Sequence, residues 1–268
     1  MPENNSTPTL AAQFILHDLA SPLTAWTTTA HAAAELRTVQ IWQAALDVVS
    51  DAQLAALTTS LDAPERQRAA RFQFERDRRR FVAARGILRG LLGRALDVPP
   101  AALTFDYGPQ GKPTLAARFS AAVPSCAAAG QQPQGELCFN VSHSGGWALF
   151  ALAWNRAVGI DLEAGERLAA RPPAELDRLA ARILSARELA LWQTLPVTLR
   201  RAAFLRAWTR KEAYAKATGA GIFAALDRVE VALDPAPSLS FPDGAWLLHD
   251  LPAPASGYAA ALAVERWQ

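Results

Sequence analysis

The chain has 268 residues, 51% of them hydrophobic, and its formal net charge at pH 7 is +2. This size and composition support a substantial core, which excludes a disordered protein. The small net charge argues against wholesale nucleic-acid binding. The longest apolar run, WALFALAW, is too short to span a bilayer. We therefore expect a globular protein without a membrane anchor.

The first 35 or so residues are rich in Ser, Thr, Pro and Ala and show no clear periodicity. This pattern predicts a loose N-terminal extension over residues 1–35. The first twenty residues lack the positively charged region of a secretory signal. Cys126 and Cys138 have no metal-ligand spacing, so free thiols in a cytoplasmic protein are expected.

An N-terminal α+β half is expected over residues 36–152. TVQIWQAALDVV indicates a strand, Asp51–Ser60 a short helix, and Pro64 the start of a second helix. From Phe72 to Leu96 apolar residues recur at helical spacing, which predicts a helix with its arginines on the opposite face. LTFDYGPQGKPTL then indicates two short strands around a turn, and ELCFNVSH a further strand.

A C-terminal α+β half is expected over residues 153–268. WALFALAW and AVGIDLE run back to back across Asn155 and Arg156, which predicts a hairpin. Helical patterns cover Pro173–Leu195 and Leu199–Thr218, and strands are expected at RVEVAL, AWLLHDL and YAAALAVERW. In both halves a helix that carries basic residues is followed by a break of small residues and then by strands. We interpret this repeated order as a faint internal duplication. A cleft between two such halves is the natural ligand site.

In AVGIDLE, strand alternation places Gly159, Asp161 and Glu163 on one face, opposite the apolar residues. This spacing allows one hard divalent cation such as Mg²⁺ to bridge both carboxylates. The alternative is a strand end that points two charges at solvent. Gly159 is expected to leave room for a ligand on the same face.

The helix FLRAWTRKEAYAKATGAGI places Trp208, Glu212 and Lys216 on one stripe. The alternative is a surface Glu–Lys pair. However, Trp208 favours a stripe that faces protein, and charges buried there need partners. A third carboxylate for the cation and an ammonium for a phosphate would meet that need.

Lysine is scarce among the 27 basic residues and occurs only at Lys112, Lys211 and Lys216. A chain that supplies nearly all its positive charge as arginine has a reason to keep a lysine, such as an ammonium that acts as a point charge on phosphate. Chance remains the alternative. Lys112 lies in GPQGKPT, a stiff turn or simply a solvated one. Arg68 and the arginines after it form either an anion site or a solvated helix face.

With GKP, FNVSHSGG, GIDLE and WTRKEAYAKATGAGI in this order, the chain resembles Sfp-type 4′-phosphopantetheinyl transferases from about Leu61 to Val231. The resemblance implies two similar α+β halves that form an intramolecular pseudodimer. It also implies a Mg²⁺-dependent enzyme that transfers the 4′-phosphopantetheine arm of coenzyme A to a serine of an apo carrier protein and releases 3′,5′-adenosine bisphosphate. The implied partners are coenzyme A and an acidic carrier protein, with no nucleic acid or membrane, and the implied state is a monomer.

The resemblance also implies roles for individual residues. Asp161, Glu163 and Glu212 would bind Mg²⁺, Glu212 would help deprotonate the attacking serine, and Lys216 would neutralise the leaving phosphate. The coenzyme A phosphates would be contacted by four residues: Arg68, Lys112, Ser142 and His143. The role of Arg68 depends on aligning RFQFERD with the corresponding segment of the family.

Overall fold

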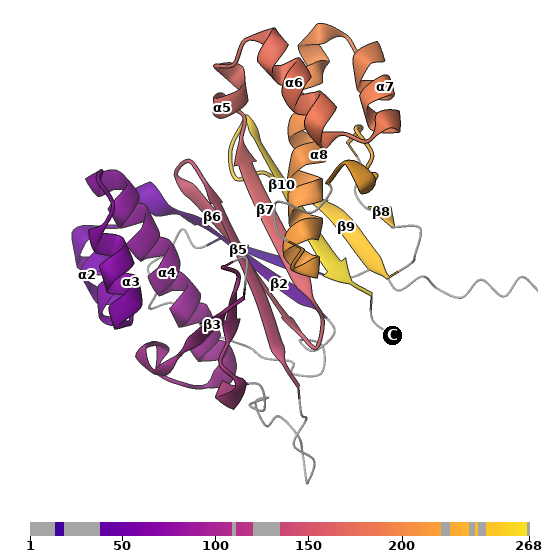
Figure 1. The fold of residues 1–268 in the computed structure, drawn as a ribbon. Helices are drawn as coiled ribbons and strands as arrows, with labels where there is room; N and C mark the ends of the chain where they lie inside the picture. The colour runs from indigo at the N-terminus through magenta and orange to yellow at the C-terminus, as the bar shows by residue number, and fades with distance from the viewer. Residues whose placement is uncertain are drawn as a thin grey trace, which may run out of the picture.

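Two four-stranded sheets, each covered by helices on one face, make up the protein (Figure 1). The computed structural model describes residues 14–18, 38–108, 111–119, 135–220, 226–235, 239–240 and 245–266. The strands are β1 (Phe14–Asp18), β2 (Val39–Ala45), β3 (Phe105–Tyr107), β4 (Pro113–Leu115), β5 (Leu137–Ser144), β6 (Trp147–Trp154), β7 (Val158–Ala164), β8 (Leu239–Ser240), β9 (Trp246–Leu251) and β10 (Tyr258–Glu265). The sheet orders are β1-β2-β6-β5 and β7-β10-β9-β8, and β3 pairs with β4 alone.

The helices lie between strands along the chain. They are α2 (Asp51–Thr59), α3 (Ala63–Ala70), α4 (Glu75–Leu96), α5 (Glu166–Ala169), α6 (Pro173–Ile183), α7 (Ala186–Thr194) and α8 (Val197–Thr218). Helices α2–α4 come after β2, and α5–α8 come after β7. Short 3₁₀ helices are η1 (Leu46–Val48), η2 (Pro100–Ala102), η3 (Ala117–Phe119) and η4 (Leu226–Arg228). Within these ranges no helix is long and apolar enough to cross a membrane.

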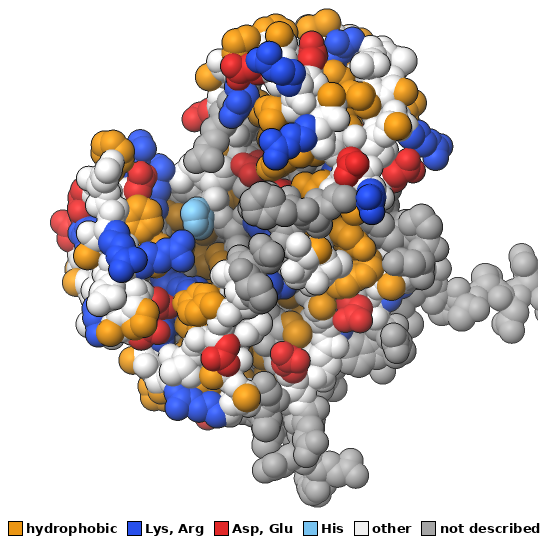
Figure 2. Space-filling view, in the orientation of Figure 1, with side chains coloured by type: hydrophobic (Ala, Val, Ile, Leu, Met, Phe, Trp, Pro, Cys, Tyr) orange, Lys and Arg blue, Asp and Glu red, His pale blue; other side chains and the backbone are white. Residues whose placement is uncertain are grey.

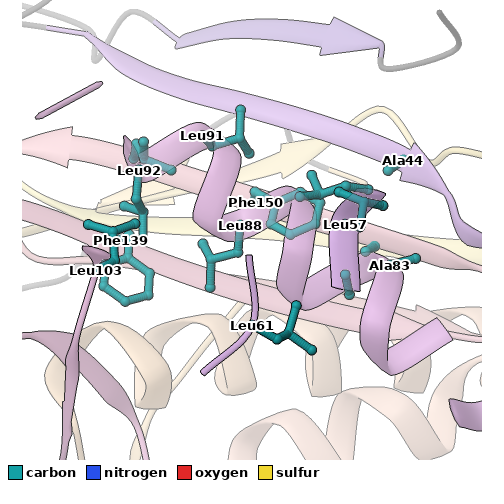
Figure 3. Packing of buried hydrophobic residues seen from close by; sticks show 14 of the residues in the cluster. Ala44, Leu57, Leu61, Ala83, Leu88, Leu91, Leu92, Leu103, Phe139 and Phe150 are labelled. Carbon is teal, nitrogen blue, oxygen red and sulfur yellow. The ribbon is translucent and has the colours of Figure 1, made fainter. Parts of the chain in front are cut away.

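In the N-terminal half, α2–α4 pack on the first sheet. The apolar positions of α4 recur at helical spacing, so Leu88 and Leu92 enter one core cluster with Phe139 and Phe150 of the sheet (Figure 3). The predicted helix is confirmed, although it begins at Glu75 rather than Phe72.

The C-terminal half repeats this arrangement. β2 and β7 have 7 residues each, and α4 and α8 have 22 each. The helix before each long helix starts with a capping box, formed by Asp62 and Glu65 in α3 and by Ser185 and Glu188 in α7. β2 pairs antiparallel with β6, the last strand of the N-terminal half. In the same way, β7 pairs antiparallel with β10, the last strand of the C-terminal half. Two similar α+β halves, as predicted, are confirmed.

The repeat extends to a buried ion pair. Arg89 and Lys211 hold the same position counted from the first residue of α4 and α8. Arg89 Nε donates to Glu65 Oε2 at 2.6 Å, and Lys211 Nζ lies 2.6 Å from Glu188 Oε2. Each cation therefore links its long helix to the capping-box glutamate of the helix before it. Lys211 thus has a structural role in α8.

The arginines of α4 divide between two environments. Arg79 and Arg80 pair at the surface with Asp51 and Asp47, and Figure 2 shows basic and acidic side chains intermingled over these helices. The prediction that the arginines lie opposite the core is wrong for Arg89, whose side chain is fully buried. Its partner Glu65 lies on α3, and contacts between helices leave no periodic signal in the sequence.

A second layer of core lies between the two sheets. It combines Val39, Ile41 and Leu149 of the first sheet with Val158, Ile160, Leu162 and Leu262 of the second. The predicted alternation of β7 is therefore confirmed, because its apolar residues face this core. The order of layers is helices, sheet, sheet, helices (Figure 1).

The two sheets meet at β5 and β7, which have no backbone ladder between them. Asn140 Oδ1 accepts the N–H of Ile160 at 2.9 Å. Ser142 Oγ accepts the N–H of Leu162 at 3.2 Å, and Ser144 Oγ accepts the N–H of Ala164 at 3.0 Å. We call these three side chains and the part of β7 that they hold the seam.

The predicted hairpin between β6 and β7 is wrong. β6 pairs with β2 and β5, whereas β7 pairs with β10. The hairpin instead joins β5 and β6 and turns at Gly145, whose φ is 57°. Asn155 has a φ of 53°, and its Oδ1 accepts the N–H of Glu136. The chain therefore leaves the first sheet at Asn155 and enters the second.

Two further predictions need correction. Residues 14–18, inside the predicted loose extension, form β1, which pairs in parallel with β2. The run FILH is typical of a strand, and the rest of residues 1–35 lies outside the described residues. RVEVAL, predicted as a strand, forms the end of η4 and then irregular chain. Side chains of other segments bind its backbone groups in place of a neighbouring strand. The N–H of Val231 donates to Glu188 Oε1 at 2.6 Å, and Arg206 donates to Leu233 O at 3.0 Å.

Candidate active site

The carboxylates of β7 lie beside the seam. Asp161 is 2% exposed, and its Oδ1 accepts from Ser142 Oγ at 2.9 Å. Glu163 Oε2 accepts from Ser144 Oγ at 3.3 Å, and Oε1 accepts from Trp208 Nε1 at 3.1 Å. Both carboxylates are therefore oriented by neutral donors from β5 and α8 and do not point freely into solvent.

The predicted stripe of α8 faces β7. Glu212 is 4% exposed, and Lys216 Nζ donates to Asp161 Oδ1 at 2.6 Å and to Ser142 Oγ at 2.9 Å. With Trp208 bound to Glu163, all three stripe residues lie at the site. A surface Glu–Lys pair is thereby excluded, because Lys216 pairs with Asp161.

Gly159 has a different purpose from the one predicted. A Cβ added there would overlap the backbone of α8 at Ala213 and Ala217. The prediction that Gly159 leaves room for a ligand is therefore wrong, since α8 fills that space. The glycine instead lets α8 approach β7 closely enough for its stripe to reach the carboxylates.

The carboxylates influence one another electrostatically. Burial raises the pKa of Glu212 to about 7, and the charges of Asp161 and Glu163 add to this rise while Lys216 opposes it. Burial, followed by the charge of Asp161, also raises the pKa of Glu163. Excess negative charge is thus concentrated at one buried place, a setting common to functional sites.

Two oxygen atoms of this set favour a cation. Asp161 Oδ2 and Glu212 Oε1 are buried and have no hydrogen-bond partner among the residues that the structure describes. Buried carboxylate oxygens are costly unless paired, and an all-oxygen donor set suits a hard divalent cation such as Mg²⁺. Across the described ranges no three His, Cys, Asp or Glu side chains are gathered as a formed metal site. The predicted ligands therefore stay a prediction, which the two unpaired oxygen atoms support.

The four residues predicted to hold phosphates are not gathered in one cluster. Lys112 Nζ donates to the backbone O of Lys216, and burial lowers the pKa of Lys112. Ser142 lies in the seam, whereas His143 is exposed and points to the opposite face of β5. Arg68 is exposed on α3, with its guanidinium 5.2 Å from the ring centroid of Phe81. Lys112 and Ser142 thus adjoin the carboxylate site, and the contacts to phosphate remain predictions.

Sequence reasoning missed Asn140 and Ser144 as parts of the site. The signal was present, because NVSHS puts Asn140, Ser142 and Ser144 at alternate positions of one strand. What it lacked was the identity of the partner, since the N–H groups of β7 lie twenty residues further along the chain.

Comparisons with known proteins cover both halves. A model of the 4′-phosphopantetheinyl transferase superfamily matches residues 157–263, and one of the N-terminal part of 4′-phosphopantetheinyl transferases matches residues 48–155. The 4′-phosphopantetheinyl transferase HetI of Nostoc sp. is 41% identical over 227 residues, 84% of this chain and 87% of that protein. A putative 4′-phosphopantetheinyl transferase of Synechocystis sp. is 36% identical over 63% of this chain and 61% of its own length. A crystal structure of a holo-(acyl-carrier-protein) synthase from Bacillus anthracis in complex with CoA (3′,5′-ADP) is 22% identical, with a TM-score of 0.29, and covers 42% of this chain and 96% of that one.

Proposed function

The chain belongs to the 4′-phosphopantetheinyl transferase superfamily, and we propose that it transfers the 4′-phosphopantetheine arm of coenzyme A to a serine of an acidic apo carrier protein. The other product is 3′,5′-adenosine bisphosphate. The observation that carries this proposal is the set of three carboxylates, the buried Asp161 and Glu212 and the half-buried Glu163, with Lys216 paired to Asp161. A structural ion pair with one lysine needs only one carboxylate, whereas further carboxylates beside it suit a divalent cation, which in turn binds the pyrophosphate oxygen atoms.

The proposed reaction forms a bond between the serine oxygen and the phosphorus that carries pantetheine. The bond from that phosphorus to the bridging pyrophosphate oxygen breaks, and the adenosine bisphosphate leaves with the electron pair. The serine proton goes to Glu212, a buried carboxylate whose pKa in the cation-free protein is raised to about 7, chiefly by burial. Lys216 places an ammonium beside the carboxylates, where it would neutralise charge on the departing phosphate.

Asp161, Glu163 and Glu212 would hold Mg²⁺, through oxygen atoms that include the unpaired Asp161 Oδ2 and Glu212 Oε1. The chemistry that Mg²⁺ supplies when bound is neutralisation of the pyrophosphate oxygen atoms. Lys112, which already contacts the end of α8, and His143, exposed on β5, are the proposed contacts to the coenzyme A phosphates.

Intact-mass spectrometry of apo carrier proteins tests the reaction. With the enzyme, coenzyme A and Mg²⁺, a carrier should gain the mass of one phosphopantetheine arm. Consumption of coenzyme A without any gain on the carrier would indicate hydrolysis and contradict the proposal.

An Asp161→Asn variant tests the site within the same assay. Loss of one charge from the carboxylate set should lower the rate by roughly 10²-fold or more, while circular dichroism shows an unchanged fold. Asp106→Asn, at an exposed position of β3, is the matched control and should transfer at the normal rate. Normal transfer by Asp161→Asn would remove this site from the mechanism.

A further inference from the structure

The two serines of the seam each make the same pair of hydrogen bonds. Ser142 Oγ accepts the N–H of Leu162 and donates to the carboxylate of the residue before it, Asp161. Ser144 Oγ likewise accepts the N–H of Ala164 and donates to the carboxylate of Glu163, the residue that precedes Ala164. Each serine therefore fixes one backbone position of β7 together with one site carboxylate.

Asn140 provides an internal comparison. It accepts the N–H of Ile160 in the same register, but the residue before Ile160 is Gly159, which has no side chain to hold. Asn140 thus makes the backbone half of the contact alone. The difference between Asn140 and the serines is the hydrogen bond to a carboxylate.

The hydroxyl of Ser142 is fully used. A hydroxyl donates one hydrogen bond and accepts two, and Ser142 Oγ donates to Asp161 and accepts from Leu162 N–H and Lys216 Nζ. Both Ser142 and Lys216 bind Asp161 Oδ1, which leaves Oδ2 as the unpaired oxygen. Ser142 therefore selects which oxygen of Asp161 is available to a cation.

We propose that Ser142 and Ser144 are positioning residues for the metal site: their hydroxyl groups hold Asp161 and Glu163 in the orientation that binds the divalent cation, a role that replaces the predicted contact of Ser142 with a coenzyme A phosphate. The N-terminal half thereby sets the geometry of carboxylates that belong to the C-terminal half. This inference rests on the proposed use of these carboxylates as Mg²⁺ ligands.

Titration of the full chain with Mn²⁺, followed by electron paramagnetic resonance, measures cation affinity without substrate or turnover. Ser142→Ala and Ser144→Ala should each weaken Mn²⁺ binding by roughly tenfold or more, as loss of a hydrogen bond to a metal ligand does. Asn140→Ala removes one acceptor of a β7 N–H in the same way, yet should change the affinity by less than about twofold because it holds no carboxylate. Ser142→Thr keeps the hydroxyl and should restore the affinity.

Equal Mn²⁺ weakening by Asn140→Ala and the serine variants would show that the seam supports only the fold and would overturn the proposal. Wild-type affinity in both serine variants would overturn it as well. If Ser142→Ala does not fold, Ser144→Ala decides, because Ala164 is the last residue of β7.

The kinetics of transfer separate positioning from direct contact. At saturating Mg²⁺, Ser142→Ala should keep its KM for coenzyme A within about twofold, because no contact to substrate is lost. A raised KM with unchanged Mn²⁺ affinity would assign Ser142 to coenzyme A and overturn the proposal. A protein whose Mn²⁺ affinity depends on Ser142 and Ser144 as expected, but which modifies no carrier, would contradict the proposed function alone. Transfer by a wild-type protein that binds no Mn²⁺ would contradict the positioning role alone.

Discussion

Burial of the Glu212 carboxyl carries a stability cost that depends on pH. Its pKa is raised from 4.5 to about 7 in the folded protein, chiefly by burial. Between these values the folded protein keeps a proton that the unfolded chain has lost. The free energy of unfolding therefore falls as pH rises through this window, and the cost is fully present above pH 7.

Glu212→Gln should remove this cost. In the absence of divalent cations, we expect the variant to melt roughly 2–4 °C above wild type at pH 8, with the difference vanishing toward pH 4. Differential scanning calorimetry at several pH values measures it. Glu166→Gln, at an exposed position, is the control and should show no such trend. An unchanged Tm at pH 8 would mean that the fold tolerates the Glu212 charge at no cost.

Single residues were predictable where the cause is local. Strand alternation alone placed Asp161 and Glu163 on one side of β7, and helical spacing alone placed Glu212 with Lys216. Lysine scarcity pointed equally to Lys211, which instead forms a buried pair with Glu188 on α7. Scarcity marks a residue as special, but only the tertiary partner tells structure from chemistry.

At the scale of elements, the buried pair of Lys211 and Glu188 joins α8 to α7. Lys211→Met should lower the free energy of unfolding by about 3–5 kcal/mol, because it leaves a buried carboxylate without its cation. Arg187→Met is the matched control. The Arg187 side chain is 79% exposed, and its Nη1 lies 3.8 Å from Glu230 Oε2, so the substitution should lower the free energy of unfolding by less than about 0.5 kcal/mol. Urea denaturation measures both, and a small effect at Lys211 would contradict the structural role.

The close packing of α8 on β7 leads to a second prediction. Gly159→Ala should destabilise the protein by about 1–3 kcal/mol or more, since the added methyl group meets the helix backbone. Gly90 is the control, because a Cβ there meets nothing within 4 Å and the residue lies inside α4. Gly90→Ala should stabilise by about 0.5–1 kcal/mol. Thermal melts of the two variants should therefore shift in opposite directions.

Helices were predictable from the sequence and strand pairing was not. The periodicity of α4 and α8 is contained within each segment, so their existence and buried faces follow from local spacing. The partners of β6 and β7 depend on segments far along the chain, and nearness in sequence suggested a hairpin that does not exist. The predicted strand at RVEVAL was wrong for a related reason. Its backbone groups hydrogen-bond with the side chains of Glu188 and Arg206, which lie on helices α7 and α8.

For the whole molecule, the two halves should unfold together. The core between the sheets draws on Ile41 and Leu149 from one half and on Ile160 and Leu262 from the other. Neither half can expose that core without losing the other's contacts. Far-ultraviolet circular dichroism, tryptophan fluorescence and calorimetry should report one coincident transition, and two separate steps would contradict a shared core.

The duplicated halves differ at the positions of the proposed site. Trp42 of β2 holds the position of Asp161 in β7, and Gly90 of α4 holds that of Glu212 in α8. The duplication itself was faintly visible in the sequence. The sequence also assigned the proposed site to the C-terminal half, because only that copy has carboxylates at these positions.

The seam has a consequence for recombining such proteins. A hybrid that joins the N-terminal half of one relative to the C-terminal half of another inherits two intact helix layers, but its carboxylates depend on hydroxyl groups supplied by the foreign half. A crossover at residue 156 would take β7 from one parent and the three seam side chains, Asn140, Ser142 and Ser144, from the other. A functional hybrid should therefore take β5 and β7 from the same parent.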